Sequence, residues 1–299
     1  SAALAGMRRI ADCFLVHDRD ILWRHDDSLA AENGGAMQLW RRARGHSWQL
    51  PACDLRRPVL AAGGELKNAF AAGAKDWLLL SPYHGKLESS SGIGLWKDAV
   101  RRTLSLLPQA PEVLACDLHP DYHASIFAHQ LAAELQLPLE PVPHHYAHAL
   151  AALAEFGMGE ALALVCDGTG LGPDGTLWGG ELLYVSRASG GRRLGCFQPA
   201  PLPGGEAAIR DVRRQAWARA WQAGVPPTAT VARYGDEAAV QMTYRQCEQR
   251  LNAPLSAAAG RLFDAFAVHL GTAPEAVTYE GQAAIRLEAA AWRESGGDL

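Results

Sequence analysis

Between residues 59 and 80, apolar residues fall into short runs separated by turns. Val59–Ala62, Ala69–Ala72 and Trp77–Leu80 are three such runs, and Gly63-Gly64 separates the first two. Runs of this length between turn residues are typical of strands joined as hairpins. We therefore expect an antiparallel meander over residues 59–80.

Strand and helix patterns alternate after the meander. Apolar residues recur at helical spacing up to Pro108, and a buried strand is expected over Val113–Cys116. A second helix is expected to stop before Pro138, and a short strand through Val142 precedes a third helix over His144–Phe156. This order is typical of an α/β domain.

The pattern restarts at Glu160. Strands are expected over Ala161–Cys166, Leu182–Val185 and Leu194–Phe197, and a helical region follows. Because both halves begin with three strands, the sequence predicts a duplicated α/β fold with a cleft between the halves. The chain ends before the second half repeats the whole pattern of the first, so we expect that half to be incomplete.

The expected divisions are an ordered element with a linker over residues 1–57, a first half over 58–158 and a second half over 159–299. Residues 1–6 are interpreted as an added leader, with Met7 as the natural start.

Composition excludes several classes of protein. The 299 residues are 48% hydrophobic and 20% charged, with a formal net charge of -4, so no general basic field favours nucleic acid. No apolar run is long enough to span a membrane or to form a signal peptide, and we expect a cytoplasmic protein. The six cysteines occur singly and are interpreted as reduced thiols; a catalytic thiol is the less favoured alternative.

Two histidines and an aspartate are the candidate metal ligands. His144 and His148 are four residues apart on an expected helix, so their imidazoles share one face, whereas His145 is expected to point away. Asp167 lies at the carboxyl end of an expected strand. In α/β domains, side chains at this end of the strands commonly bind ligands. Two histidines and a carboxylate suit zinc and iron alike. A pair of ordinary surface histidines is the alternative.

A glycine-rich segment runs from Asp167 to Glu181. Its backbone N–H groups could surround a phosphate, although an ordinary hairpin around Asp174-Gly175 is the alternative. Gly63–Asn68 is a similar turn, and Lys67 could supply a positive charge to phosphate.

A third candidate cluster follows the strand at residues 113–116. Asp117 and His119 are expected at the mouth of the cleft, unless they form only a helix-capping turn. His123 and His129 are interpreted as surface histidines.

At these residues the sequence resembles the HypF-type carbamoyltransferases of [NiFe]-hydrogenase maturation. The matching segments extend over nearly the whole chain, in family order. They are residues 14–21, 26–28, 41–45, 64–68, 117–122, 144–148, 167–181, 202–205, 260–265 and 279–281.

The resemblance implies an actin-like (ASKHA), TsaD-like fold in which His144, His148 and Asp167 bind a divalent metal, zinc or iron. Residues 10–44 resemble the end of a YrdC-like domain. The late Gly-Asp-Gly-Gly and Gly-Gly-Val segments of the family are missing, and water or another chain would complete the metal site. Ala257 and Ala258 replace family serines, and Val212 replaces a proline.

The resemblance also implies roles for other residues. Asp117 and His119 are the expected catalytic residues. ATP or carbamoyl-adenylate is the expected nucleotide, with its phosphate near the glycine segment and its nucleoside near residues 260–264 and Glu280. The nucleotide-binding candidates are Lys67, Gly168, Thr169, Gly170, Gly172, Gly260, Arg261, Asp264 and Glu280.

The implied reaction is carbamoyl transfer from carbamoyl-adenylate to the C-terminal cysteine thiol of HypE, which leads to the cyanide ligands of the hydrogenase. Synthesis of carbamoyl-adenylate is not expected of this chain alone. One alternative is an ATP-dependent kinase of the same fold. Another is a non-catalytic fragment that binds HypE or forms homo-oligomers through its uncovered surface.

Overall fold

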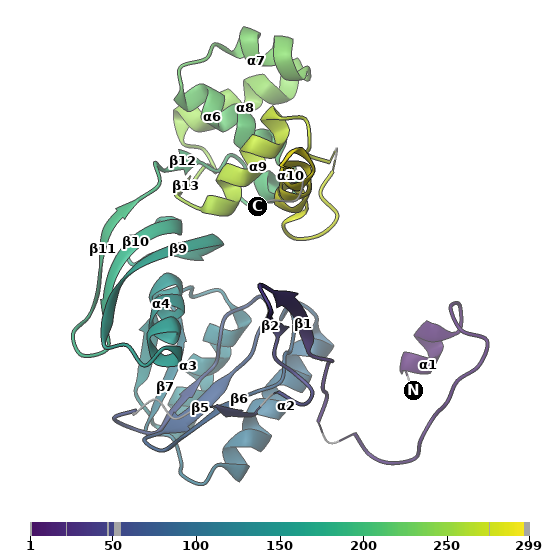
Figure 1. Cartoon of the computed structure of the whole chain (residues 1–299), viewed down its shortest axis with the longest axis vertical. Coiled ribbons are helices and arrows are strands. Elements are labelled where there is room, and N and C mark those ends of the chain that lie inside the picture. Colours follow the sequence, from purple (N-terminus) through teal and green to yellow (C-terminus); the bar gives the residue numbers. More distant parts are fainter. Residues whose placement is uncertain (1, 22, 47, 51–54, 275, 296–299) are drawn as a thin grey trace.

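The computed structural model describes residues 2–21, 23–46, 48–50, 55–274 and 276–295. The first half is built on a six-stranded sheet with the strand order β3-β6-β5-β4-β7-β8 (Figure 1). Its strands are β3 (Trp48–Leu50), β4 (Val59–Ala61), β5 (Ala71–Ala74), β6 (Trp77–Leu80), β7 (Val113–Asp117) and β8 (Leu139–Val142). Strands β4, β5 and β6 pair antiparallel, which confirms the predicted meander, and β7 joins β4 in parallel.

Two helices cover this sheet. Helix α2 (Ser90–Leu106) begins where Ser89 Oγ accepts the Gly92 N–H, and α3 (His123–Leu135) ends at Gln136 in the left-handed conformation. The Trp96 and Phe127 rings meet edge to face in the core between these helices and the sheet. Both helices were predicted from the spacing of their apolar residues.

A second sheet has β10 at its centre. Strands β9 (Glu160–Leu171) and β11 (Gly190–Cys196) pair antiparallel with opposite edges of β10 (Leu177–Ser186). The short strand β13 (Leu255–Ser256) pairs in parallel with β10 at Leu177, opposite β9, and β12 (Ala200–Pro201) pairs with β13. The predicted three-strand start of the second half is therefore confirmed.

Helix α4 (His144–Glu155) follows β8 in the chain but packs on the second sheet. Its Ala149 and Leu153 side chains are buried with Val165 of β9 and Leu183 of β10. The helix lies between the two sheets (Figure 1), so it carries residues of the first half onto strands of the second.

Helices form the rest of the second half. They are α5 (Ala207–Arg210), α6 (Arg213–Gln222), α7 (Pro227–Tyr234), α8 (Glu237–Gln249), α9 (Ala259–His269) and α10 (Gln282–Glu294). Small cores hold them together: Trp217 packs with Val240 and Tyr244, and Val212 packs with Ala267 and Ala283. After β13, the described part of the chain contains helices and no further strand.

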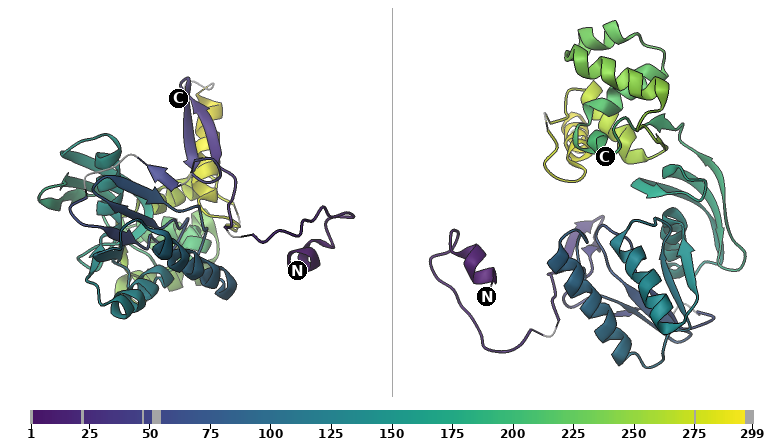
Figure 2. Two further views of the ribbon diagram at one scale, coloured as in Figure 1. Left: turned by 90° about the horizontal axis from the view of Figure 1, so that it is seen from below. Right: turned by 180° about the vertical axis from the view of Figure 1, so that it is seen from behind.

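The N-terminal residues form three separate pieces. Helix α1 (Ala2–Met7) is joined by an extended segment to the hairpin of β1 (Leu29–Asn33) and β2 (Ala36–Arg41), and Figure 2 shows α1 away from both sheets. Strand β3 pairs with β6, so residues 48–50 belong to the first sheet. The division at residue 57 stays a prediction.

Cys53 lies outside the residues that the structure describes. The other five cysteines are free thiols. Cys116 is buried, whereas Cys166 is exposed because its side chain lies on the face of β9 opposite α4. None of the described helices combines the length and the apolar character that crossing a membrane requires.

Candidate metal and nucleotide site

Three predicted metal ligands converge where α4 meets β9. His144 Nε2 lies 3.2 Å from His148 Nε2 and 3.4 Å from Asp167 Oδ2. One ligand atom from each residue lies within 4.8 Å of the others. Helical spacing brings the two histidines together, and the packing of α4 on the second sheet brings in Asp167.

A bulge in β9 begins at Asp167, whose side chain lies on the same face of the strand as Val165, toward α4. The ladder with β10 pairs Gly170 with Trp178 and Cys166 with Gly180, so three residues of β9 lie opposite Gly179 alone. Gly179 has φ +149°, and a Cβ there would lie 2.8 Å from the Asp167 carbonyl oxygen. The bulge interrupts the pairing and brings Gly170, three residues after Asp167, to the same α4-facing side of β9.

Glu181 stabilises the β10 side of this bulge. Oε1 of its buried carboxylate accepts hydrogen bonds from the N–H groups of Gly179 and Gly180. Oε2 accepts a hydrogen bond from Arg193 Nε at 2.6 Å. These donors satisfy the buried carboxylate, which in turn fixes the backbone around it.

Asp117 orients the first histidine. Its buried Oδ2 lies 2.8 Å from His144 Nδ1, and its Oδ1 accepts the His119 N–H. The hydrogen bond to Asp117 raises the pKa of His144, while burial and the neighbouring His144 lower the pKa of His148. An imidazole that donates from Nδ1 to a carboxylate presents its Nε2 lone pair, as in carboxylate–histidine–metal sites.

The residues fit a divalent metal. Burial opposes the charge on Asp167, but the nearby His145 ring and the Gly168 N–H outweigh it, so the pKa of Asp167 is lowered. Asp167 Oδ2 is buried and accepts no hydrogen bond from the described residues. An ionised carboxylate oxygen without a donor beside two imidazole nitrogens is a donor set for zinc or iron.

His145 corrects one expectation. Instead of pointing away from the site, it is fully buried, and its Nε2 lies 3.5 Å from Asp167 Oδ2. Gly170 makes room for it, because a Cβ at Gly170 would lie 2.7 Å from His145 Cε1. Helical spacing could not show this contact, since it depends on β9 passing beside α4.

His119 lies two residues after Asp117 and is half-buried. Its ring stacks on Tyr122 with 4.3 Å between ring centroids, and its Nδ1 accepts the Asp121 N–H. Burial and the charges of Asp117, Glu65 and Asp167 raise the pKa of Tyr122 to about 12. Sequence reasoning missed Tyr122, although it stands within the segment that carries Asp117 and His119.

Another contact missed by sequence reasoning joins the glycine turn at residues 63–68 to α3. His123 is exposed, which agrees with its interpretation as a surface histidine, and its Nδ1 lies 2.5 Å from Glu65 Oε1. Gly64 of the same turn is adjacent to the His144 ring, because a Cβ there would lie 3.7 Å from His144 Cε1. The turn therefore borders the metal site.

The predicted glycine loop is largely strand. Strand β9 continues to Leu171, and Gly172 N–H donates to Thr176 O, which closes a hairpin around Asp174-Gly175. The hairpin at Asp174-Gly175 lies where it was expected, and the end of the strand expected at Cys166 is corrected to Leu171. Phosphate binding by this segment stays a prediction. Gly172 packs on the Trp178 indole, where a Cβ would be 2.1 Å from Nε1.

The other nucleotide-binding candidates are brought together from distant parts of the chain in two contacts. Gly260, at the start of α9, approaches the bulge that contains Gly168 and Thr169; a Cβ at Gly260 would lie 3.1 Å from Gly168 Cα. Lys67 Nζ lies 2.9 Å from Glu280 Oε1, which joins the glycine turn to the segment before α10.

Arg261 and Asp264 bind each other. Arg261 Nε donates to Asp264 Oδ2 at 2.7 Å, and both side chains are buried in α9. Burial raises the pKa of Asp264 although Arg261 opposes the shift. In this structure these two candidates form an internal ion pair.

Comparison with known proteins agrees with this architecture. The family models "HypF Kae1-like domain" and "Carbamoyltransferase, Kae1-like Domain, second subdomain" match residues 54–155 and 163–298. The fold and the site thus define a Kae1-like α/β domain of two subdomains. The chain belongs to the HypF family of carbamoyltransferases, and the recognition and fold class predicted above are confirmed.

Individual relatives show how much of the family this chain represents. It is 42% identical to carbamoyltransferase HypF2 of Cupriavidus necator, over 95% of this chain and 36% of the relative. It is 37% identical to carbamoyltransferase HypF of Synechocystis sp., over 96% of this chain and 39% of the relative. A crystal structure of full-length HypF in the phosphate- and nucleotide-bound form superposes on this chain with a TM-score of 0.86 and 32% sequence identity. The match covers 96% of this chain and 38% of the HypF chain. The chain spans little more than a third of these relatives.

Proposed function

We propose that this chain is the carbamoyl-transfer region of a HypF-type enzyme. The observation that carries the proposal is the convergence of His144 Nε2, His148 and the unpartnered Asp167 oxygen. The names of the relatives supply the reaction class, and the proposed donor and acceptor are carbamoyl-adenylate and the C-terminal cysteine of HypE. The proposed setting is cytoplasmic assembly of the cyanide ligands of [NiFe]-hydrogenase.

His144, His148 and Asp167 would hold the metal, zinc or iron. When bound, such an ion supplies Lewis-acid polarisation of a carbonyl oxygen. Asp117 acts here as a positioning residue, because both of its carboxylate oxygens already accept hydrogen bonds from His119 and His144.

His119, two residues after Asp117, is proposed to be a catalytic residue that contacts the substrate. Because its Nδ1 accepts the Asp121 N–H, the neutral ring carries its proton on Nε2 and can donate it toward a substrate oxygen. In the reaction, the acceptor sulfur bonds to the carbamoyl carbon, the bond from that carbon to the phosphate oxygen breaks, AMP leaves, and the thiol proton is released.

The nucleotide is proposed to lie against the surface formed where the β9 bulge meets the start of α9. Gly168, Thr169 and Gly260 provide close backbone approach there, and α9 directs its N-terminus toward the bulge. Gly170, Gly172, Arg261 and Asp264 are proposed to support this site through packing and pairing. Lys67 and Glu280 would border it from the glycine turn and the segment before α10.

A single-turnover assay tests the proposal. Synthetic carbamoyl-adenylate and HypE are mixed with the full chain, the acceptor is followed by intact mass, and bound metal is quantified. We expect carbamoylated HypE with the wild type and with the exposed control His129→Ala, and a loss of at least a hundredfold with His148→Ala. HypE binding without transfer by the metal-loaded wild type would identify a binding module, and ADP formation from ATP would identify a kinase.

A further inference from the structure

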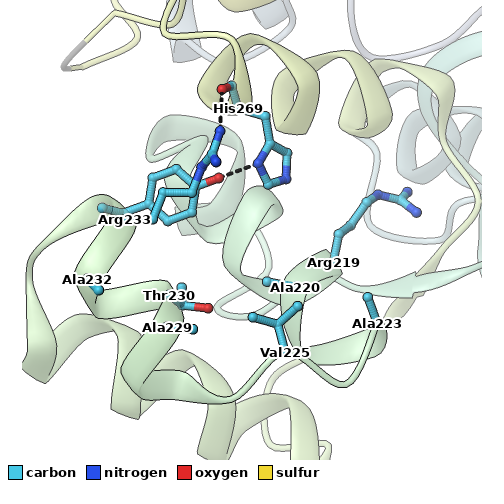
Figure 3. A pocket seen from close by; sticks show the side chains of 10 residues that line it. Arg219, Ala220, Ala223, Val225, Ala229, Thr230, Ala232, Arg233 and His269 are labelled. Atoms are coloured by element: carbon cyan, nitrogen blue, oxygen red, sulfur yellow. Dashed lines mark hydrogen bonds between the residues drawn. The ribbon is translucent and has the colours of Figure 1, made fainter.

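A second cavity lies among the helices of the second half, away from the metal site. It has a volume of about 690 Å³ and is bounded by α6, α7 and the end of α9 (Figure 3). Helix α7 lies at the end of the molecule opposite the first sheet (Figure 1). The volume is in the range of small-molecule sites, about 300–1,000 Å³.

The walls of this cavity are mostly apolar. Ala220, Val225 and Ala229 line the middle, whereas Arg219 lies on one side and Arg233 with His269 on the other (Figure 3). No carboxylate is among the described residues that line it. The cavity is open to solvent, since Val225 and Ala229 are exposed, and it combines apolar walls with positive charge.

Arg233 already has partners within the protein. Its guanidinium donates to the His269 carbonyl oxygen at 2.9 Å, and the neighbouring Tyr234 hydroxyl bonds to His269 Nδ1. These contacts tie α7 to the end of α9. Arg233 and His269 therefore serve as a structural wall of the cavity.

Arg219 differs from Arg233. Its Nε is buried without a hydrogen-bond partner, and no carboxylate of the described residues forms an ion pair with its guanidinium. Burial lowers the pKa of Arg219, and no neighbouring acidic group offsets that effect. A partly buried cation without a counter-charge is costly, so such groups are normally paired.

We propose that this cavity binds a small amphiphilic carboxylate, with its acid group on Arg219 and its apolar body against the alanine-rich wall. The planar guanidinium matches a carboxylate in geometry and charge. One available guanidinium matches a monoanion better than a phosphate dianion, which takes several donors. The site is separate from the proposed carbamoyl-transfer chemistry and does not depend on it.

Calorimetric titration of the full chain with octanoate and with octan-1-ol tests this site, because the two probes share an alkyl chain and differ in charge. We expect octanoate to bind at least tenfold more tightly than octanol. Arg219→Met should abolish this preference, while Arg245→Met, an exposed arginine on α8, should keep it. Ala229→Leu should weaken both probes by narrowing the cavity.

Three results would overturn the proposal: equal affinity of the wild type for both probes, no binding of octanoate, or an unchanged preference in Arg219→Met. The wild-type comparison and Ala229→Leu remain decisive if Arg219→Met does not fold, which circular dichroism would show.

Discussion

Asp117 Oδ2 lies 2.8 Å from His144 Nδ1, although the two residues belong to different elements. Asp117 ends β7, and His144 begins α4 after β8. The contact turns the other ring nitrogen of His144 toward His148 and Asp167. The end of the first sheet thereby orients a ligand that faces a strand of the second.

Replacing Asp117 with asparagine tests this orientation. The amide is neutral and cannot stabilise the Nδ1–H imidazole as the carboxylate does, so we expect metal affinity to fall tenfold to a hundredfold. Competition with a chromophoric chelator measures the change. Asp121→Asn, on the exposed turn nearby, should bind metal as the wild type does.

Removing a ligand should have a larger effect. His148→Ala deletes a donor from the exposed end of the site, and we expect stoichiometric metal retention to be lost while the circular dichroism spectrum is unchanged. Metal analysis after gel filtration measures retention. If the variant keeps one equivalent of metal, the assignment of His148 as a ligand is wrong.

Gly170→Ala tests the close approach of β9 to α4. The added Cβ would lie 2.7 Å from His145 Cε1 and 3.0 Å from His144 Cβ, so one element must shift. We expect a loss of about 1–3 kcal/mol in the free energy of unfolding, together with weaker metal binding. Gly195→Ala on β11 is the control, because no heavy atom lies within 4 Å of its added Cβ.

Arg193→Met tests the buried ion pair beneath the β9 bulge. The substitution leaves the fully buried Glu181 without its ion-pair partner, and we expect about 3 kcal/mol of destabilisation in urea denaturation. Arg101→Met removes the solvent-exposed pair with Glu134 and should destabilise the protein much less than Arg193→Met does. Equal effects of the two substitutions would contradict the structural role of Glu181.

His84 should make stability depend on pH. Burial, together with the nearby His25, lowers the pKa of His84 from 6.5 to about 4. Between these values the unfolded chain binds a proton that the folded chain does not. The free energy of unfolding should therefore fall by about 2 kcal/mol as the pH drops from 6.5 to 4, after allowing for partial exposure of His84.

His84→Phe keeps an aromatic ring against Phe70, whose centroid is 5.4 Å from that of His84, and cannot titrate. We expect this variant to lose most of that pH slope, as measured by urea denaturation at several pH values. His129→Gln, which removes an exposed histidine, should retain the slope; if His84→Phe retains it as well, His84 is not its source.

Local patterns determined much of the fold and part of the site. Short apolar runs and glycine turns were enough to predict the meander over residues 59–80, and helical spacing was enough to place His144 and His148 on one face. These features depend on neighbours in the chain, whose geometry follows from the periodicity of strands and helices.

Tertiary structure decided the rest. The position of Asp167 beside α4, the burial of His145 beside Gly170 and the pairing of Arg261 with Asp264 all depend on how α4 and α9 pack on β9 and β10. The amino-acid sequence by itself supplied the chemical groups and their local periodicity. Their roles required the fold, because contacts between segments distant in the chain are set by packing rather than by spacing.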